Sequence, residues 1–145
     1  MRPRLFSLSL MAIVSLTTSL ACLAQKPSYD VTIVADGKPL DLSQGIPAHT
    51  RTLQLRAQLT QNSQQQYPQL KPTVLINKAI LNLVRDTRRV SFVNWPSDES
   101  VASLFKQAQV GDRFLIQFED VESQTKGGVV QKIDNSKIVQ VTVKK

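Results

Sequence analysis

The sequence has very little of the chemistry that many proteins depend on, since its 145 residues include only one cysteine and one histidine. A single cysteine cannot close a disulfide within the chain, so stability must come from an apolar core. About 120 residues can build such a core without cross-links. The sequence therefore excludes a small disulfide-framework protein.

Catalytic and metal-binding motifs are also missing. The one histidine, His49 in "GIPAHTR", has no neighbours at the spacing of a metal site such as His-Glu-x-x-His. A general base needs an aligned partner, and none is apparent for His49. Adjacent carboxylates occur at 98–99 and 119–120, but the first pair suits a helix start and adjacent strand residues point to opposite faces. We therefore predict that the protein is not an enzyme and uses no metal or cofactor.

Long apolar runs are absent after the first residues of the chain. "MRPRLFSLSLMAIVSLTTSLACLAQ" has a basic start, an apolar run and a small-residue end, which is the layout of a secretory signal peptide. We place the signal peptide at residues 1–24, with cleavage between Ala24 and Gln25. The run is shorter than the roughly 20 apolar residues of a spanning helix. We therefore expect an exported, periplasmic protein whose mature chain, residues 25–145, has no transmembrane helix.

Cys22 allows a second interpretation, in which it is acylated and anchors the protein to a membrane. A lipoprotein signal usually has leucine three positions before the cysteine, where this chain has Ser19. The better fit is an ordinary cleavage site that removes Cys22. A lipid anchor at Cys22, or release from the cell, remains the alternative.

Acidic residues are few compared with basic ones, and the chain carries a net charge of +7. The basic residues are scattered, and only Arg85, Arg88 and Arg89 cluster. No stacking-aromatic motif accompanies them, so we expect no nucleic-acid partner. Attraction to an acidic protein surface or anionic lipid is one use of such charge, and a simply solvated surface is the other.

Alternation of apolar and polar residues is the main structural pattern. Residues 29–35 and 53–59 alternate as half-buried strands, and Asp36-Gly37 predicts a tight turn after the first. A polar, glutamine-rich segment at 60–72 predicts a loop. Residues 74–84 and 90–93 predict a hairpin with its tip at 86–88.

The pattern then changes to a helical one. Val101, Leu104, Phe105 and Ala108 are spaced as one face of a short helix that ends at Gly111, with Ser97 or Asp98 as its cap. The next strand has two faces, one with Phe114, Ile116 and Phe118 and the other with Leu115, Gln117, Glu119 and Val121. Strands at 129–133 and 138–143 follow.

These elements predict a single all-β domain, an antiparallel immunoglobulin-like sandwich of about seven strands with one short helix. A partly open barrel is the alternative. Trp95, before Pro96, is either a corner of the core or an anchor for a partner. Arg85, Arg88 and Arg89, at the predicted hairpin tip, are the best candidates for partner binding, because arginine is favoured at interfaces.

The segments "TVLINKAILNLVRDTRRVSFVN", "SVASLFKQAQVGDRFLIQFEDV" and "KGGVVQKI" together resemble the C-terminal periplasmic domain of the GldM/PorM family of Bacteroidota. The resemblance covers roughly residues 70–143. It implies a non-enzymatic role in gliding motility or type IX secretion, with dimerising β-rich domains that reach toward a ring complex. This chain departs from the family by having a signal peptide in place of a membrane helix, and one domain.

The resemblance implies a structural and protein-interaction module of the cell envelope. Its partner would be a GldM-like protein, a ring-complex component or a second copy of the chain. The alternative is a free-standing exported binding domain, such as an adhesin, a sugar binder or an inhibitor.

Overall fold

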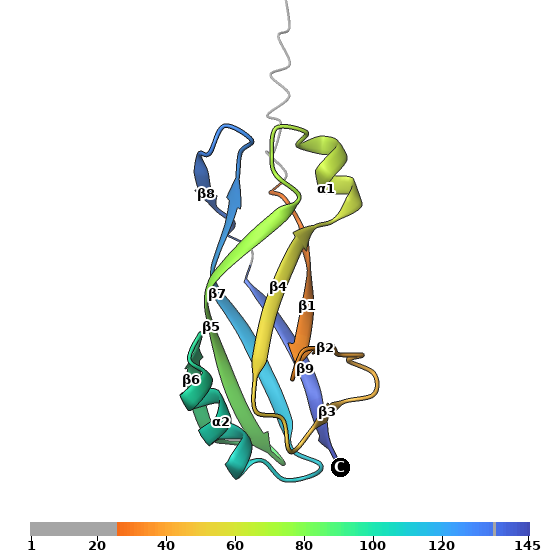
Figure 1. Cartoon of the computed structure of the whole chain (residues 1–145), viewed down its shortest axis with the longest axis vertical. Coiled ribbons are helices and arrows are strands. Elements are labelled where there is room, and N and C mark those ends of the chain that lie inside the picture. The colour runs from red at the N-terminus through yellow and green to blue at the C-terminus, as the bar shows by residue number, and fades with distance from the viewer. Residues whose placement is uncertain (1–25, 135) are drawn as a thin grey trace, which may run out of the picture.

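The computed structural model describes residues 26–134 and 136–145, and within them the chain is mostly β-strand (Figure 1). The predicted signal peptide, with Cys22, Ala24 and Gln25, lies outside the described residues. The strands are β1 Tyr29–Ala35, β2 Lys38–Pro39, β3 Ile46–Pro47, β4 Leu53–Leu59, β5 Thr73–Arg85, β6 Arg88–Trp95, β7 Arg113–Gln124, β8 Val130–Lys132 and β9 Lys137–Lys144. The helices are α1 Gln61–Gln66 and α2 Asp98–Gln107.

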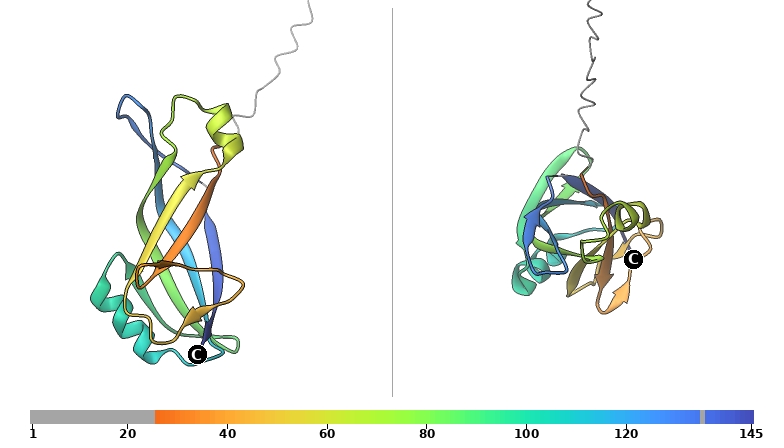
Figure 2. Two further views of the ribbon diagram at one scale, coloured as in Figure 1. Left: turned by 45° about the vertical axis from the view of Figure 1, so that its right-hand side comes forward. Right: turned by 90° about the horizontal axis from the view of Figure 1, so that it is seen from above.

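The strands form one sheet in the order β2-β1-β4-β5-β7-β9-β3, with β6 paired to β5 and β8 paired to β7. Seen from above, the sheet curls around into a half-barrel (Figure 2). Most pairs are antiparallel, but β3 and β9 are parallel, so the sheet is mixed. The all-β prediction is confirmed. The curled single sheet is closer to the partly open barrel than to a two-sheet sandwich, and the described residues hold nine strands and two helices.

Local sequence explains the first strands well. β4 buries every second residue, from Leu53 to Leu59, as the alternation predicts. Between β1 and β2, Asp36 and Gly37 both have positive φ, 48° and 78°. That combination belongs to the tight type I′ turn, which matches the twist of a hairpin.

The two longest strands, β5 and β7, change partners along their length. The first two residues of β5 pair with β4, and its second half pairs with β6. The first half of β7 pairs with β9, and its last three residues pair with β8. Between these parts the register skips Asn77 on β5 and Glu119 on β7. An extra residue in a strand shifts the alternation by one. Val121 is therefore buried with Phe118, and its predicted place on the opposite face is wrong.

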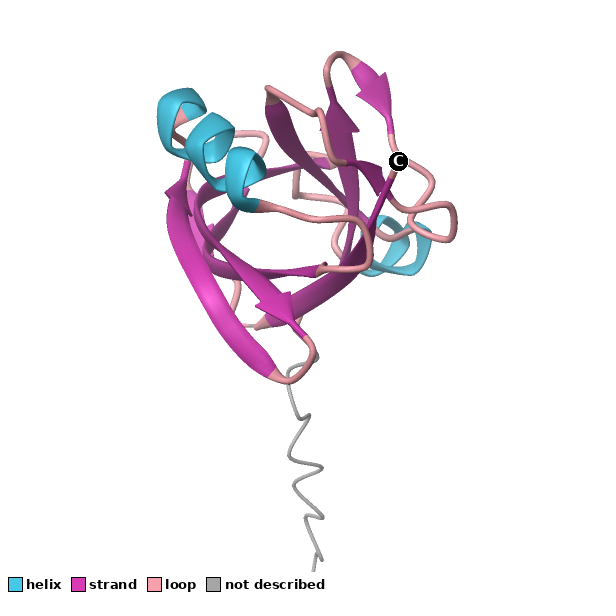
Figure 3. Cartoon of the chain, turned by 90° about the horizontal axis from the view of Figure 1, so that it is seen from below, coloured by secondary structure: helices cyan, strands magenta, loops and turns pink. Residues whose placement is uncertain are grey.

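Helix α2 follows the predicted face, because Val101, Leu104 and Phe105 are buried. Ser97 caps its start, with its side chain accepting a hydrogen bond from the Ser100 amide. The helix ends at Gln107, not at Gly111, because the chain leaves helical geometry at Ala108 and makes a separate turn. Seen from below, α2 lies across one side of the curled sheet (Figure 3).

Trp95 packs against the core at the end of β6, which favours the core interpretation of this residue. Its Nε1 donates a hydrogen bond of 2.9 Å to the Leu53 carbonyl at the start of β4. β4 and β6 are not paired as strands. This side chain therefore joins two parts of the sheet that the backbone leaves apart.

The segment 60–72, predicted as a loop, contains the short helix α1. Thr60 caps it by accepting from the Ser63 amide. Ser63 is itself buried, and its Oγ accepts from the Ser28 amide at 2.8 Å. Neither residue is apolar, so this helix has no apolar period to identify it. Leu70 is buried beyond the helix and secures the rest of the segment.

The segment from Gly37 to Thr52 connects β1 to β4 and also reaches β9 through β3. Gly45 permits this approach, with φ of +84° and a position where a Cβ would lie 2.5 Å from the Thr142 carbonyl oxygen. At the other end of β9, the Lys137 Nζ donates a hydrogen bond of 2.7 Å to the carbonyl of Tyr29, the first residue of β1.

Both helices of the described chain are too short and too polar to span a bilayer.

Candidate functional site

The three arginines of the β5–β6 hairpin have different surroundings. Arg85 makes a two-pronged ion pair with Asp112, with Nε–Oδ1 and Nη2–Oδ2 distances of 2.9 and 2.8 Å. Asp112 is buried, and hydrogen bonds from Arg85 hold the pKa of this carboxyl below its ordinary value. Arg85 also donates to the Gln107 carbonyl at 3.1 Å. Arg85 therefore joins β5 to the segment after α2, and much of its donor capacity is used.

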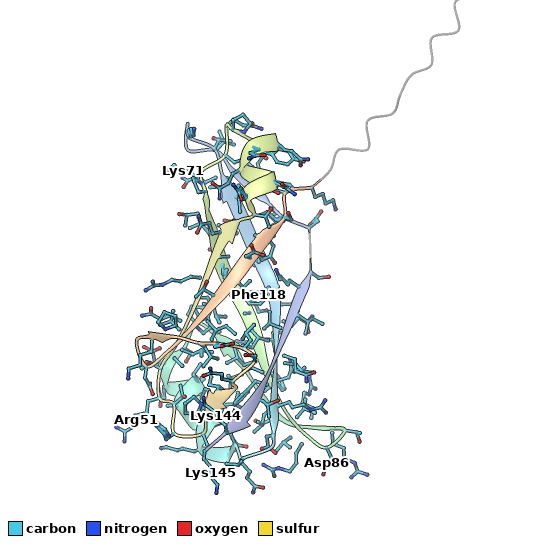
Figure 4. All side chains as sticks on the ribbon, turned by 90° about the vertical axis from the view of Figure 1, so that its right-hand side faces the viewer. Arg51, Lys71, Asp86, Phe118, Lys144 and Lys145 are labelled. Carbon is cyan, nitrogen blue, oxygen red and sulfur yellow. The ribbon has the colours of Figure 1, made fainter. Side chains whose placement is uncertain are left out.

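Arg88 and Arg89 begin β6, and both are exposed. The guanidinium of Arg89 lies over the ring of Phe92, 4.7 Å from its centroid. Its Nη1 donates to Asn82 Oδ1 at 3.3 Å. The hairpin tip, marked by Asp86 in Figure 4, lies at one end of the molecule. Partner binding by the three arginines stays a prediction, and Arg88 and Arg89 are better placed for it than Arg85.

Arg89 borders a larger surface, the side of β6, β5, β7 and β9 that points away from the core. Strand register places residues from all four strands in two rows across it. One row is Phe92, Asn82, Leu115 and Gln140, and the next is Asn94, Ile80, Gln117 and Ile138. We call these eight residues the outer face. None of them is charged.

The outer face exposes large apolar side chains to solvent. Phe92 is 52% exposed and Ile138 is 62% exposed. Beside the outer face, strand register aligns Arg89 of β6, Val84 of β5 and Arg113 of β7 in a third row. Two of these three residues are cationic. An uncharged centre with charge at the border is the composition of a protein interface. Sequence analysis missed this surface, and the only signal for it was an apolar residue at an outward position of each of the four strands: Ile80, Phe92, Leu115 and Ile138.

A second feature lies under the segment 36–52, where a cavity of about 430 Å³ is lined by Lys38, Asp41, His49 and Lys144, among others. The carboxylates around it hold the loop itself. Asp36 Oδ1 accepts hydrogen bonds from the amides of Arg51 and Thr52, which lowers its pKa. These hydrogen bonds fix the loop around the cavity, and His49 lines the same cavity as Asp36.

The two carboxylate pairs lie in different surroundings. Asp98 and Glu99 lie in the first turn of α2, as predicted, where negative charge suits the helix end. Glu119 lies at the irregularity of β7, and Asp120 is opposite Lys78. Among the described residues, no three histidine, cysteine or carboxylate groups gather in a way that could hold a metal ion.

Comparison with known proteins adds no neighbour, since no family model, curated protein or solved structure matches the chain.

Proposed function

We propose that this chain is a non-enzymatic, exported protein-binding module that contacts its partner through the outer face. The observation that carries the proposal is the exposure of Phe92 and Ile138 on an uncharged sheet surface. Large apolar side chains that gather on one face, bordered by polar residues, are typical of interaction sites.

The types of residue also support this proposal. Aromatic residues and arginine are enriched among the residues that contribute most to binding. Phe92 and Arg89 are such a pair, and they are already in contact. Because the arginine stacks on the ring and bonds to Asn82, it is partly ordered before binding. Less conformational entropy is then lost when a partner docks.

Charge indicates what kind of surface would fit. Arg89 and Arg113 lie along one border of the outer face, and no carboxylate belongs to its two rows. A complementary partner has an apolar centre with acidic residues along one side, as electrostatic complementarity requires. A second copy of the chain meets this requirement less well, because the outer face carries no acidic residue of its own.

The proposal includes the relation to the GldM/PorM C-terminal domain, and with it the immunoglobulin-like character and the place in the cell envelope. It rests on the residues quoted above, which lie mainly in β5, β6, α2, β7 and β8. A role in gliding motility or type IX secretion follows only if the partner belongs to that apparatus.

The test is photo-crosslinking in the native host from a photoreactive residue at Phe92 or Ile138. Val129 is the matched control, since it is also apolar and 59% exposed but lies beside β8. We expect a discrete crosslinked protein from positions 92 and 138 and not from 129. Equal crosslinking from all three positions contradicts the proposal.

Binding of the identified partner is then measured with purified variants. Phe92→Ala should weaken binding by about 30-fold, the effect of losing roughly 2 kcal/mol at a well-packed aromatic contact. Val129→Ala is the control and should leave affinity unchanged. Unchanged affinity in Phe92→Ala removes the outer face from the interface, and sedimentation of the free domain decides whether a second copy binds instead.

A further inference from the structure

A separate cleft lies between α2 and the segment that leads into β4. It has a volume of about 550 Å³, in the range of small-molecule sites. One wall comes from the segment 48–51 and the other from α2. The lining residues are Ala48, His49, Thr50, Arg51, Ala102, Phe105 and Lys106. None of them belongs to the outer face, so this site is independent of the proposed function.

The wall before β4 is held in place by hydrogen bonds. The Arg51 amide donates to Asp36 Oδ1 at 3.0 Å, and the Ala48 amide donates to the Lys144 carbonyl at 2.9 Å. Thr50 is buried, and its Oγ1 donates to the Pro47 carbonyl at 2.7 Å. The backbone that carries Arg51 is therefore fixed, which is a requirement for a preformed site.

The helical wall is fixed by packing. Phe105 is buried, and its ring centroid lies 4.7 Å from that of Phe114 in β7. Ala102 and Lys106 are near it on the same helix, at spacings of three residues and one residue. Ala102 on this wall and Ala48 on the other are small and only partly buried, which leaves room between the walls.

The charge of the lining has one sign. Arg51 and Lys106 border the cleft, and no carboxylate lines it. Within residues 26–134 and 136–145, ion pairs join Lys26 to Asp134 and Arg85 to Asp112, so the charges of Arg51 and Lys106 are unpaired. In Figure 4, Arg51, Lys144 and Lys145 all lie toward the same end of the molecule, so this end carries several cationic side chains.

We infer that this cleft binds a small organic carboxylate with an apolar body. The carboxylate would lie between Arg51 and Lys106, and the apolar body would rest on Ala48, Ala102 and Phe105. A guanidinium can meet a carboxylate with two parallel hydrogen bonds, which makes Arg51 the main contact. The apolar floor distinguishes such a ligand from a simple inorganic anion.

The probe is phenylacetate, titrated into the isotope-labelled mature domain and followed by amide chemical shifts. We expect saturable shifts at Ala48, Arg51, Ala102 and Lys106. Phenylacetamide keeps the shape without the charge, and acetate keeps the charge without the ring. Phenylacetamide should bind about tenfold more weakly or worse, because it loses the charged hydrogen bonds. Acetate should also bind about tenfold more weakly or worse, because it loses the contact of the ring with Ala48, Ala102 and Phe105.

Matched variants assign the contacts. Arg51→Ala and Lys106→Ala should each weaken phenylacetate binding at least about fivefold. Arg88→Ala and Lys132→Ala remove the same kinds of exposed side chain elsewhere and should leave it unchanged. Ala102→Leu fills the cleft, keeps both cations and should abolish binding.

Three results overturn the inference. They are no saturable shift at millimolar phenylacetate, equal binding of phenylacetamide, or equal loss in Arg88→Ala. Phe92→Ala tests independence from the proposed function, because it should leave phenylacetate binding unaltered. Failure at the outer face and failure at this cleft can therefore be distinguished.

Discussion

The two faces of β5, β6, β7 and β9 come from the same strands and differ sharply in composition. The inner face carries Leu81, Leu83, Phe114 and Ile116, each at most 1% exposed. The outer face mixes apolar and amide side chains in direct contact with water. Alternation along a strand separates the two sets. Stability and binding can therefore be changed independently in one sheet, by substituting residues on the inner face or on the outer face.

The largest expected effect comes from exchanging a phenylalanine for alanine on each face. Phe114→Ala, on the inner face, should cost about 3–5 kcal/mol in the free energy of unfolding, because it leaves a cavity. Phe92→Ala, on the outer face, should cost about 0.5–1 kcal/mol, mainly the contact with Arg89. Urea unfolding of both variants measures the difference. Similar losses in the two variants would contradict a functional division between the faces.

The next effect concerns the seam where β3 meets β9 and closes the inner side. Gly45→Ala forces a Cβ against the Thr142 carbonyl in addition to a positive φ, and should cost about 2–4 kcal/mol. Gly37→Ala has a similar φ of +78° but open space around it. This control should cost only about 1–2 kcal/mol. Thermal or urea unfolding compares the two variants. An equal cost would mean that the backbone at Thr142 moves away from the added Cβ without a loss of stability.

The smallest effect is on pH dependence and concerns Asp112, the buried residue directly before β7. Its pKa is lowered in the folded protein by hydrogen bonds from Arg85 and from the Gln109 amide. The stabilisation is therefore complete above the ordinary carboxyl pKa of about 3.9 and is lost as pH falls through the lower folded value. Between about pH 5 and pH 2, the free energy of unfolding should fall more steeply than in Asp112→Asn. Parallel pH profiles would show that the ion pair contributes no net stabilisation.

Local pattern predicted most individual elements. β4, the β5–β6 hairpin, α2 and β9 follow alternation or helical spacing. β1 follows alternation as far as Ile33, and its last two residues are both buried. Helix α1 was missed because it is polar and depends on Thr60 and Ser63 for its place. The side of Val121 was missed because skipped residues in β5 and β7 reverse the alternation, and nothing local marks them.

Pairing over long distances was beyond the sequence patterns. β3 has two residues and pairs in parallel with a strand at the far end of the chain. The arginine cluster was visible, but the pairing of Arg85 with Asp112 depends on bringing β5 beside the start of β7. The outer face depends on the register of four strands, which single-strand patterns do not give. Composition along one strand therefore indicated burial, and only the assembled sheet showed which exposed residues are neighbours.

The arrangement of the strands also has a mechanical consequence. β1 begins at one end of the long axis, and β9 ends at the opposite end (Figure 1). Tension between these ends acts along the strands, through the β1–β4 and β7–β9 pairs. Inter-strand hydrogen bonds in antiparallel sheets are perpendicular to the strands, so such tension loads many of them in shear at once. A domain tethered at both ends in this way would carry force between its attachments before it unfolds.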